Sequence, residues 1–240
     1  MSQLMSTLCL EDLSWVDVAA HLARDPRLLI PVGALEQHGP HLPLGTNVRI
    51  ADRMCNDLSR EHDILRAPAF HFGVNHTMPR TFAGTAGLHR KTLHRALNEL
   101  LASWEAHGVS EFILITGHRH RSHLEALSTL VTDYARVRVV DFWDVDIGDL
   151  VSTAGPEYAG EAETSLMLHL FPTLVHMDRA RDFPANTDTR STPPIDGGPG
   201  SVGTPTRAAP DTGRLIYDRM LAAIQKAVFF RPEDRDSDTL

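Results

Sequence analysis

The sequence lacks long apolar runs, clusters of basic residues and all but two cysteines, and each shortage excludes a class of protein. No apolar stretch approaches the roughly 20 residues that span a membrane. The formal net charge of -8, with no run of Lys or Arg, argues against a nucleic-acid surface. Cys9 and Cys55 are too few for a disulfide scaffold or a cysteine zinc site. The N-terminus has no basic start followed by an apolar core, so we expect no signal peptide and a cytoplasmic protein.

The composition that remains is that of a globular protein with a sizeable core. Of the 240 residues, 42% are hydrophobic and 22% are charged, a length and balance that one α/β domain fills. We expect a single domain over residues 1–230. Within it, residues 184–212 are rich in Pro, Gly, Thr and Asp and predict a long loop, and residues 231–240 predict a disordered tail.

Apolar runs alternate with amphipathic stretches along the chain, which predicts an α/β fold with helices on both faces of a sheet. The clearest helix covers 90–107, where Leu93, Leu97, Leu100 and Trp104 recur at three- and four-residue steps on one face. The other expected elements are strands over 27–34, 64–70, 111–116 and 136–142, and helices over 46–60, 121–135, 161–170 and 213–228.

One segment, PVGALEQHGPHLPLGTN, leaves the first strand, crosses Gly and Pro, and enters a helix. Glu36 and His38 are two residues apart in it, so their side chains point to the same side if the segment is extended. In an open α/β sheet the usual site is the crevice at the carboxyl ends of the strands. A carboxylate and an imidazole there form half of a metal site.

A second pair has the same form. His118 and His120 follow the strand FILIT, again two residues apart and just past a strand end. We expect them to face Glu36 and His38 across neighbouring strand ends. Glu163, in the sequence GEAETS, falls in the first turn of a later helix, where it is placed to bind a metal or to act as a base.

Each of these signals has a plainer explanation. A single E-x-H or H-x-H is usually an accident of the surface or the core. Acids such as Glu161 and Glu163 at a helix start commonly complement the helix dipole. Two ligand pairs at two strand ends are harder to dismiss. The remaining candidates are expected to be structural or surface histidines: His41, His71, His89, His94, His107, His123, His169 and His176.

Taken together, these residues resemble the creatininase (creatinine amidohydrolase) family. The stretch PVGALEQHGPHLPLGT is very similar to the family signature. Further similar blocks follow in family order and extend the resemblance over residues 25–228. These blocks are GVNH (73–76), FAGT (82–85), TGH (116–118), AGEAETS (159–165) and GTP (203–205).

The resemblance implies a three-layer α/β/α sandwich around a mostly parallel sheet, often assembled as a hexamer. It also implies a site with two divalent metals that hydrolyses cyclic amides or related C–N bonds, including bonds of a precursor peptide. Through the resemblance, Glu36, His38 and His118 match metal ligands. Glu163 matches a site glutamate that is a ligand in some members.

Four positions depart from the family pattern. Asn47 stands where the family has an aspartate that bridges the metals, and Thr116 where its Asn-Gly-His motif begins. Tyr158 replaces a site histidine, and His120 stands where Gly or Glu is common. Two metals about 3.5–4 Å apart need bridging anionic oxygen, which Asn47 and His120 do not supply. We therefore expect one divalent metal, with zinc favoured, iron or manganese as alternatives, and a second metal doubtful.

The sequence thus predicts a metal-dependent hydrolase, or a related C–N lyase or cyclase, in a specialised biosynthetic pathway. Its substrate would be a small polar amide, a cyclic amide or a peptide. Glu163 or Glu36 is the expected base, and Tyr158 the expected hydrogen-bond donor to a developing oxyanion. Arg119 and Arg121 are candidates to bind a substrate carboxylate. The expected metal ligands are Glu36, His38, Asn47, His118 and His120.

Asn47 and Tyr158 also motivate a different class, a metal-free homologue that binds a ligand or serves as a scaffold. In either class we expect no nucleic-acid partner and no membrane. We also expect a closed homo-oligomer, with the hexamer as first choice from the resemblance. Packing the loop 184–212 against a neighbouring subunit would recover buried area that the loop lacks in a monomer.

Overall fold

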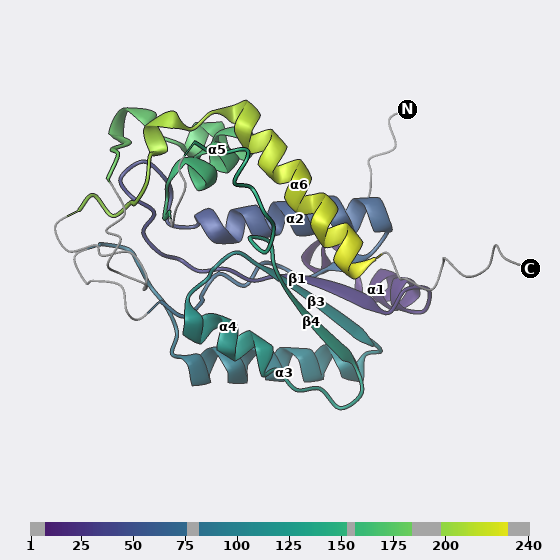
Figure 1. The fold of residues 1–240 in the computed structure, drawn as a ribbon. Coiled ribbons are helices and arrows are strands. Elements are labelled where there is room, and N and C mark those ends of the chain that lie inside the picture. Colours follow the sequence, from purple (N-terminus) through teal and green to yellow (C-terminus); the bar gives the residue numbers. More distant parts are fainter. Residues whose placement is uncertain (1–7, 76–81, 153–156, 184–197, 230–240) are drawn as a thin grey trace, which may run out of the picture.

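A four-stranded parallel sheet forms the centre of the computed structural model (Figure 1). Its strands are β1 (Arg27–Pro31), β2 (Leu65–Arg66), β3 (Glu111–Thr116) and β4 (Arg136–Asp141), in the order β2-β1-β3-β4. All three pairings are parallel. The structure describes residues 8–75, 82–152, 157–183 and 198–229.

Helices cover both faces of this sheet (Figure 1). One face carries α2 (Thr46–His62), α5 (Glu161–Leu170) and α6 (Pro210–Val228), and the other carries α3 (Arg90–Ala106) and α4 (Arg121–Ser128). The short helix α1 (Trp15–Leu22) adds Val18 and Leu22 to the core on the α3 side. The 3-10 turns are η1 (Leu10–Asp12), η2 (Pro172–Leu174), η3 (Met177–Arg179) and η4 (Pro205–Arg207). The predicted three-layer α/β fold is confirmed.

Side chains of the central strands alternate between two hydrophobic cores. Leu29 and Ile113 belong to the core under α2, α5 and α6, whereas Leu28 and Phe112 belong to the core under α3 and α4. Because both faces are covered, the two central strands β1 and β3 are apolar between their end residues, as is usual for a parallel sheet. Parallel pairing also brings the carboxyl ends of β1 and β3 side by side, which places the segments that follow them next to each other.

The predicted elements are present, but several of their ends are wrong. The strand predicted over 27–34 ends at Pro31, and the one predicted over 64–70 is reduced to β2. Pro68 has no N–H to donate to a ladder, and beyond it only an isolated bridge between Val32 and Phe70 continues the pairing.

The helix predicted over 121–135 ends at Ser128, because side chains form hydrogen bonds with backbone groups at and beyond its end. The hydroxyl of Thr129 donates to the carbonyl of Glu125 at 2.8 Å. The carboxylate of Glu105 accepts the backbone N–H groups of Asp133, Tyr134 and Ala135, which holds this stretch outside a helix. Such local side-chain bonds compete with helix formation.

Two further expectations need correction. On α3, Leu93 and Leu97 are buried as predicted, but Leu100 is 38% exposed and its neighbour Leu101 is buried instead. The long loop ends earlier than expected, because α6 begins at Pro210, a residue suited to the first turn of a helix. Residues 184–197 of that loop and the tail 231–240 lie outside the described residues. The single domain over 1–230 stays a prediction.

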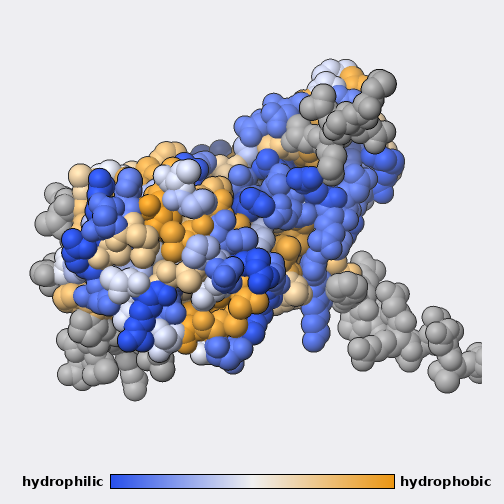
Figure 2. All heavy atoms as spheres, turned by 90° about the horizontal axis from the view of Figure 1, so that it is seen from above, coloured by the Kyte–Doolittle hydropathy of each residue, from blue (hydrophilic) through white to orange (hydrophobic). Residues whose placement is uncertain are grey.

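In the part of the chain that the structure describes, no helix has both the length and the apolar character to cross a membrane. Seen from above, the surface carries hydrophobic areas that hydrophilic side chains interrupt (Figure 2). One large hydrophobic side chain of α6, Leu215, is 44% exposed. The closed homo-oligomer stays a prediction.

The contact between α5 and α6 depends on Gly213, in the first turn of α6. A Cβ added at Gly213 would lie 1.9 Å from the carbonyl oxygen of Ser165, a backbone atom that cannot rotate away. We expect Gly213→Ala to lower the free energy of unfolding by about 1–3 kcal/mol, the usual cost of overpacking. Denaturant unfolding would measure this. Gly45→Ala is the control, because its Cβ would meet no atom closer than 3.5 Å. Equal midpoints for the two variants would contradict the prediction.

Candidate metal centre

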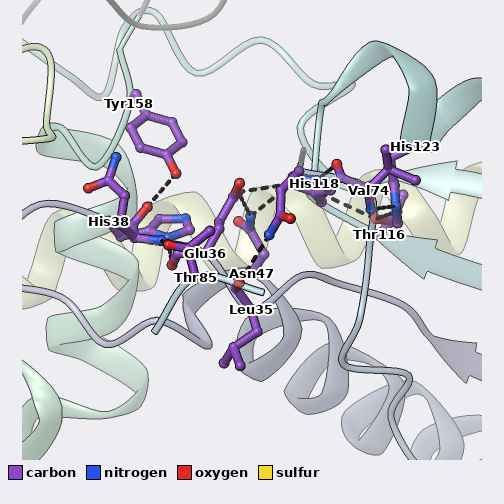
Figure 3. A network of polar contacts seen from close by, with 12 residues as sticks. Leu35, Glu36, His38, Asn47, Val74, Thr85, Thr116, His118, His123 and Tyr158 are labelled. Atoms are coloured by element: carbon purple, nitrogen blue, oxygen red, sulfur yellow. Dashed lines mark hydrogen bonds and ion pairs between the residues drawn. The ribbon is translucent and has the colours of Figure 1, made fainter. Parts of the chain in front are cut away.

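The candidate residues lie just past the carboxyl ends of β1 and β3 (Figure 3). Glu36 and His38 follow β1, and His118 follows β3. The segment after β1 folds back on itself, since the N–H of Glu36 donates to the carbonyl of Leu44 at 3.0 Å. That turn leads directly into α2, whose first turn contains Asn47. Two strand ends and one helix start thus bring four polar side chains to one buried place.

Glu36 is the centre of the first cluster. Its Oε1 lies 2.9 Å from Nδ1 of His118 and accepts a hydrogen bond from Nδ2 of Asn47 at 3.0 Å. All three side chains are buried. Burial favours the neutral acid, but the attraction and hydrogen bond of His118 outweigh it and hold the pKa of Glu36 below its ordinary value. Glu36 is therefore an anion at neutral pH, surrounded by nitrogen.

The ring of His118 is fixed by its other nitrogen. Nε2 donates to the carbonyl oxygen of Val74 at 2.8 Å, so Nδ1 is the nitrogen that faces Glu36 and Asn47. Donation of one imidazole N–H to a backbone carbonyl is the usual way in which proteins orient a metal-binding histidine.

His38 has the same arrangement in a second cluster. Its Nδ1 donates to the backbone carbonyl of Glu36 at 3.0 Å, and its Nε2 lies 3.6 Å from Oε1 of Glu163. This Nε2 is buried and has no hydrogen-bond partner among the described residues. Burial of the ring lowers the pKa of His38, but the carboxylates of Glu163 and Glu36 outweigh burial and raise it to about 9. The same two carboxylates that raise this pKa favour a positive charge at Nε2, whether it is carried by a proton or by a metal ion.

Glu163 lies in the first turn of α5, as predicted. Its Oε2 accepts the backbone N–H of Ala159, whose positive φ of 49° shapes the turn before the helix. Its other oxygen is the one that faces His38. A carboxylate held by one oxygen and free at the other can bind a cation or accept a proton.

Tyr158 stacks on the ring of His38, with 5.0 Å between the ring centroids. Its hydroxyl donates to the carbonyl of Gln37. Burial raises the pKa of Tyr158 well above its ordinary value, and the carboxylates of Glu36 and Glu163 raise it further. Tyr158 therefore stays protonated, and its proton points to the backbone at the edge of the site.

The other predicted residues are less closely placed. The ring of His120 stacks on that of His118 with 6.0 Å between centroids, at the residue that precedes α4. Arg119 and Arg121 are exposed and form ion pairs, Arg119 with Asp141 at 3.0 Å and Arg121 with Glu125 at 2.8 Å. The two arginines are thus already engaged with carboxylates of the protein itself, and the structure gives no support to a role in substrate binding.

Two histidines that were expected to be structural or exposed lie fully buried beside the site. Nε2 of His41 lies 2.9 Å from the hydroxyl of Thr164, and the ring of His123 meets that of His118 edge-on at 4.7 Å. Burial lowers the pKa of His41 to about 4 and that of His123 well below its ordinary value, so both rings are neutral. The one sequence signal for His123 was its spacing, five residues after His118 and in the helix that follows.

The types of donor atom suit a divalent cation, although the side chains are not yet gathered around one position. Among the described residues, no three His, Cys, Asp or Glu side chains are already arranged to hold a metal. The structure instead has two pairs, Glu36 with His118 and His38 with Glu163. Ligand atoms of a tetrahedral metal lie roughly 3.3 Å apart when each is about 2.0–2.1 Å from the ion. The observed separations of 2.9 and 3.6 Å bracket that value, so each pair by itself is spaced to share a cation.

Comparison with known proteins gives one consistent result. A family model described as "Creatinine amidohydrolase" matches residues 11–228. A creatinine amidohydrolase of Pseudomonas putida is 28% identical, over 90% of this chain and 94% of the relative. A mycofactocin precursor peptide peptidase of Mycobacterium ulcerans (strain Agy99) is 32% identical, over 82% of each chain.

Solved structures agree with these relatives. A crystal structure of creatinine amidohydrolase (creatininase) has a TM-score of 0.81 at 25% identity and covers 94% of this chain and 100% of that one. A creatininase variant of the Zn-Zn type and a creatininase with Mn have TM-scores of 0.80 and 0.79, each at 25% identity. They cover 92% of this chain and 98% and 99% of their own. The sequence signature, the fold and these matches together show that the chain belongs to the creatininase family.

Proposed function

We propose that this protein is a metal-dependent hydrolase that cleaves a C–N bond in a small amide, a cyclic amide or a peptide. One observation carries the metal part. His118 and His38 each donate one ring N–H to a backbone carbonyl and turn the other nitrogen toward a carboxylate, that of buried Glu36 or half-buried Glu163. The reaction class is supported by relatives named as a creatinine amidohydrolase and a precursor peptide peptidase. The second of these names also supports a biosynthetic role.

The proposed ligands are Glu36, His38 and His118, with further donors from Asn47, His120 or Glu163. Imidazole nitrogens outnumber carboxylates in this set, which favours zinc over magnesium and leaves iron or manganese as alternatives. When bound, such a cation polarises a substrate carbonyl or lowers the pKa of bound water. The neutral amide of Asn47 supports one metal rather than two.

The protein groups supply the remaining chemistry. Glu163 has one oxygen held by a backbone N–H and one facing the site, so it is the proposed general base that takes a proton from the attacking water. Tyr158 keeps its proton and lies against His38. To donate to a developing oxyanion it must exchange its bond to Gln37 for one to substrate.

A second candidate is a metal-free homologue that binds a ligand or acts as a scaffold. The 2.9 Å contact of Glu36 with His118 favours it, because the two side chains satisfy each other without a cation.

Metal content decides between the candidates. We expect protein purified without chelator to carry about one equivalent of a transition metal, measured by elemental analysis. Removal of this metal should abolish hydrolysis of a panel that includes creatinine and short peptides, and zinc should restore it. Less than a few tenths of an equivalent of any transition metal would leave the metal-free candidate standing.

A further inference from the structure

Four residues form a closed ring of hydrogen bonds behind His118 (Figure 3). Nε2 of His118 donates to the carbonyl of Val74 at 2.8 Å, and the N–H of the same Val74 donates to Nδ1 of His123 at 3.4 Å. Nε2 of His123 lies 3.3 Å from Oγ1 of Thr116. Oγ1 of Thr116 in turn accepts the backbone N–H of His118 at 3.3 Å, which closes the ring.

The direction of these bonds determines where the protons are. Val74 offers an N–H to His123, so Nδ1 of His123 must accept and its Nε2 must carry the hydrogen that Thr116 receives. Val74 offers its carbonyl to His118, so Nε2 of His118 must carry a hydrogen. The backbone N–H and carbonyl of one residue, Val74, therefore place a hydrogen on Nε2 of both histidines and leave Nδ1 of His118 directed at Glu36.

Close packing on both sides of Val74 holds its backbone in place beside His123. A Cβ added at Gly73 would lie 2.9 Å from Nδ1 of His123 and 2.6 Å from the carbonyl oxygen of Gly33. Glycine is thus required at 73 for the chain to approach His123. The next residue, Asn75, donates from Nδ2 to the carbonyls of Leu35 at 3.0 Å and Ala86 at 3.2 Å. The segment is therefore anchored on both sides of Val74.

We propose that His123 is a positioning residue for His118: through Val74 and Thr116 it fixes the ring orientation that keeps the Nε2–H of His118 on the carbonyl of Val74 and turns Nδ1 toward the metal site. That Nδ1 binds a metal rests on the proposed function, whereas the ring orientation does not. The proposal also gives a role to Thr116, at a position where the family resemblance places asparagine. A hydroxyl with two lone pairs accepts from both His118 and His123.

The test compares His123→Leu, which keeps bulk but has no hydrogen bonds, with His123→Asn, which retains an acceptor for the N–H of Val74. In metal-free protein, long-range 1H–15N NMR detects the hydrogen on Nε2 of His118. We expect this hydrogen to exchange slowly in the wild type and in His123→Asn, and faster in His123→Leu. Zinc affinity should fall about 10–100-fold in His123→Leu, the usual effect of losing such a partner, and should largely recover in His123→Asn.

His21→Leu is the matched control, because His21 is also buried but bonds to Asp63, far from the site. It should leave the His118 signals and zinc affinity unchanged. If His123→Leu does not fold, Thr116→Val removes the other half of the ring and should disturb the same signals. Unchanged exchange of the His118 Nε2–H in all ring variants would overturn the proposal. Wild-type protein that binds no zinc but shows the slowly exchanging Nε2–H would instead sink the proposed function and leave this inference intact.

Discussion

Glu36→Gln should bind zinc about 1,000-fold more weakly than the wild type and lose hydrolytic activity to the same degree. Loss of a group that merely orients a ligand costs about 10–100-fold in metal affinity, and Glu36 is expected to be a ligand itself. The amide keeps the shape of the side chain, and its oxygen still accepts from Asn47. What disappears is the buried negative charge that lies 2.9 Å from His118. A cation in a buried site depends on that charge.

Elemental analysis and a zinc titration measure the first effect, and initial rates on any substrate found for the wild type measure the second. Glu99→Gln is the matched control. Glu99 makes an exposed ion pair with Arg95 at 2.8 Å on α3, and such pairs contribute little. Zinc affinity within threefold of the wild type in Glu36→Gln would show that Glu36 is not a ligand.

The fold was predictable because its signals are local. The four inner residues of the strand Glu111–Thr116 form an unbroken apolar run, and α5 is found over the predicted residues. The ends of elements were harder, because they depend on contacts between distant residues. The end of α4 is fixed in part by Glu105, which lies on another helix and accepts three backbone N–H groups beyond it. No pattern within 121–135 contains that information.

The sequence predicted which residues lie at the site, but it did not predict which of them contact each other. Spacing of two residues past a strand end selected Glu36, His38 and His118, and all three are buried close to one another. The sequence did not indicate which partner each side chain has: Glu36 meets His118, while His38 meets Glu163.

The residues that support the site were the hardest to see. The carbonyl and N–H of Val74 orient His118 and His123, and backbone groups carry no residue-specific signal in a sequence. His123 itself looked like a structural histidine, because a lone imidazole on a helix usually is one. Its role follows from the peptide that approaches it, and that approach depends on Gly73.

Asn47→Asp should raise the metal content from about one equivalent to about two. In the wild type, Nδ2 of Asn47 donates to Glu36 at 3.0 Å, and its Oδ1 is buried with no hydrogen-bond partner among the described residues. An aspartate there would place a second buried carboxylate beside that of Glu36. Two such anions repel each other strongly unless cations lie between them, and anionic oxygen is what a pair of metals requires.

The same repulsion predicts a cost in the metal-free protein. The charge of Glu36 should raise the pKa of the new carboxyl. A carboxyl whose pKa is raised by folding destabilises the native state as pH increases through that range. We therefore expect metal-free Asn47→Asp to have a lower melting temperature than the wild type at neutral pH. The difference in melting temperature should narrow in acid, and metal should stabilise the variant more than the wild type.

Asn56→Asp is the control, since Asn56 lies on the same helix beside Asp57 and away from the site. Elemental analysis and thermal melts with and without zinc measure both effects. Unchanged metal content in Asn47→Asp would place Asn47 outside the bridging position and remove the argument that its neutral amide limits this site to one metal.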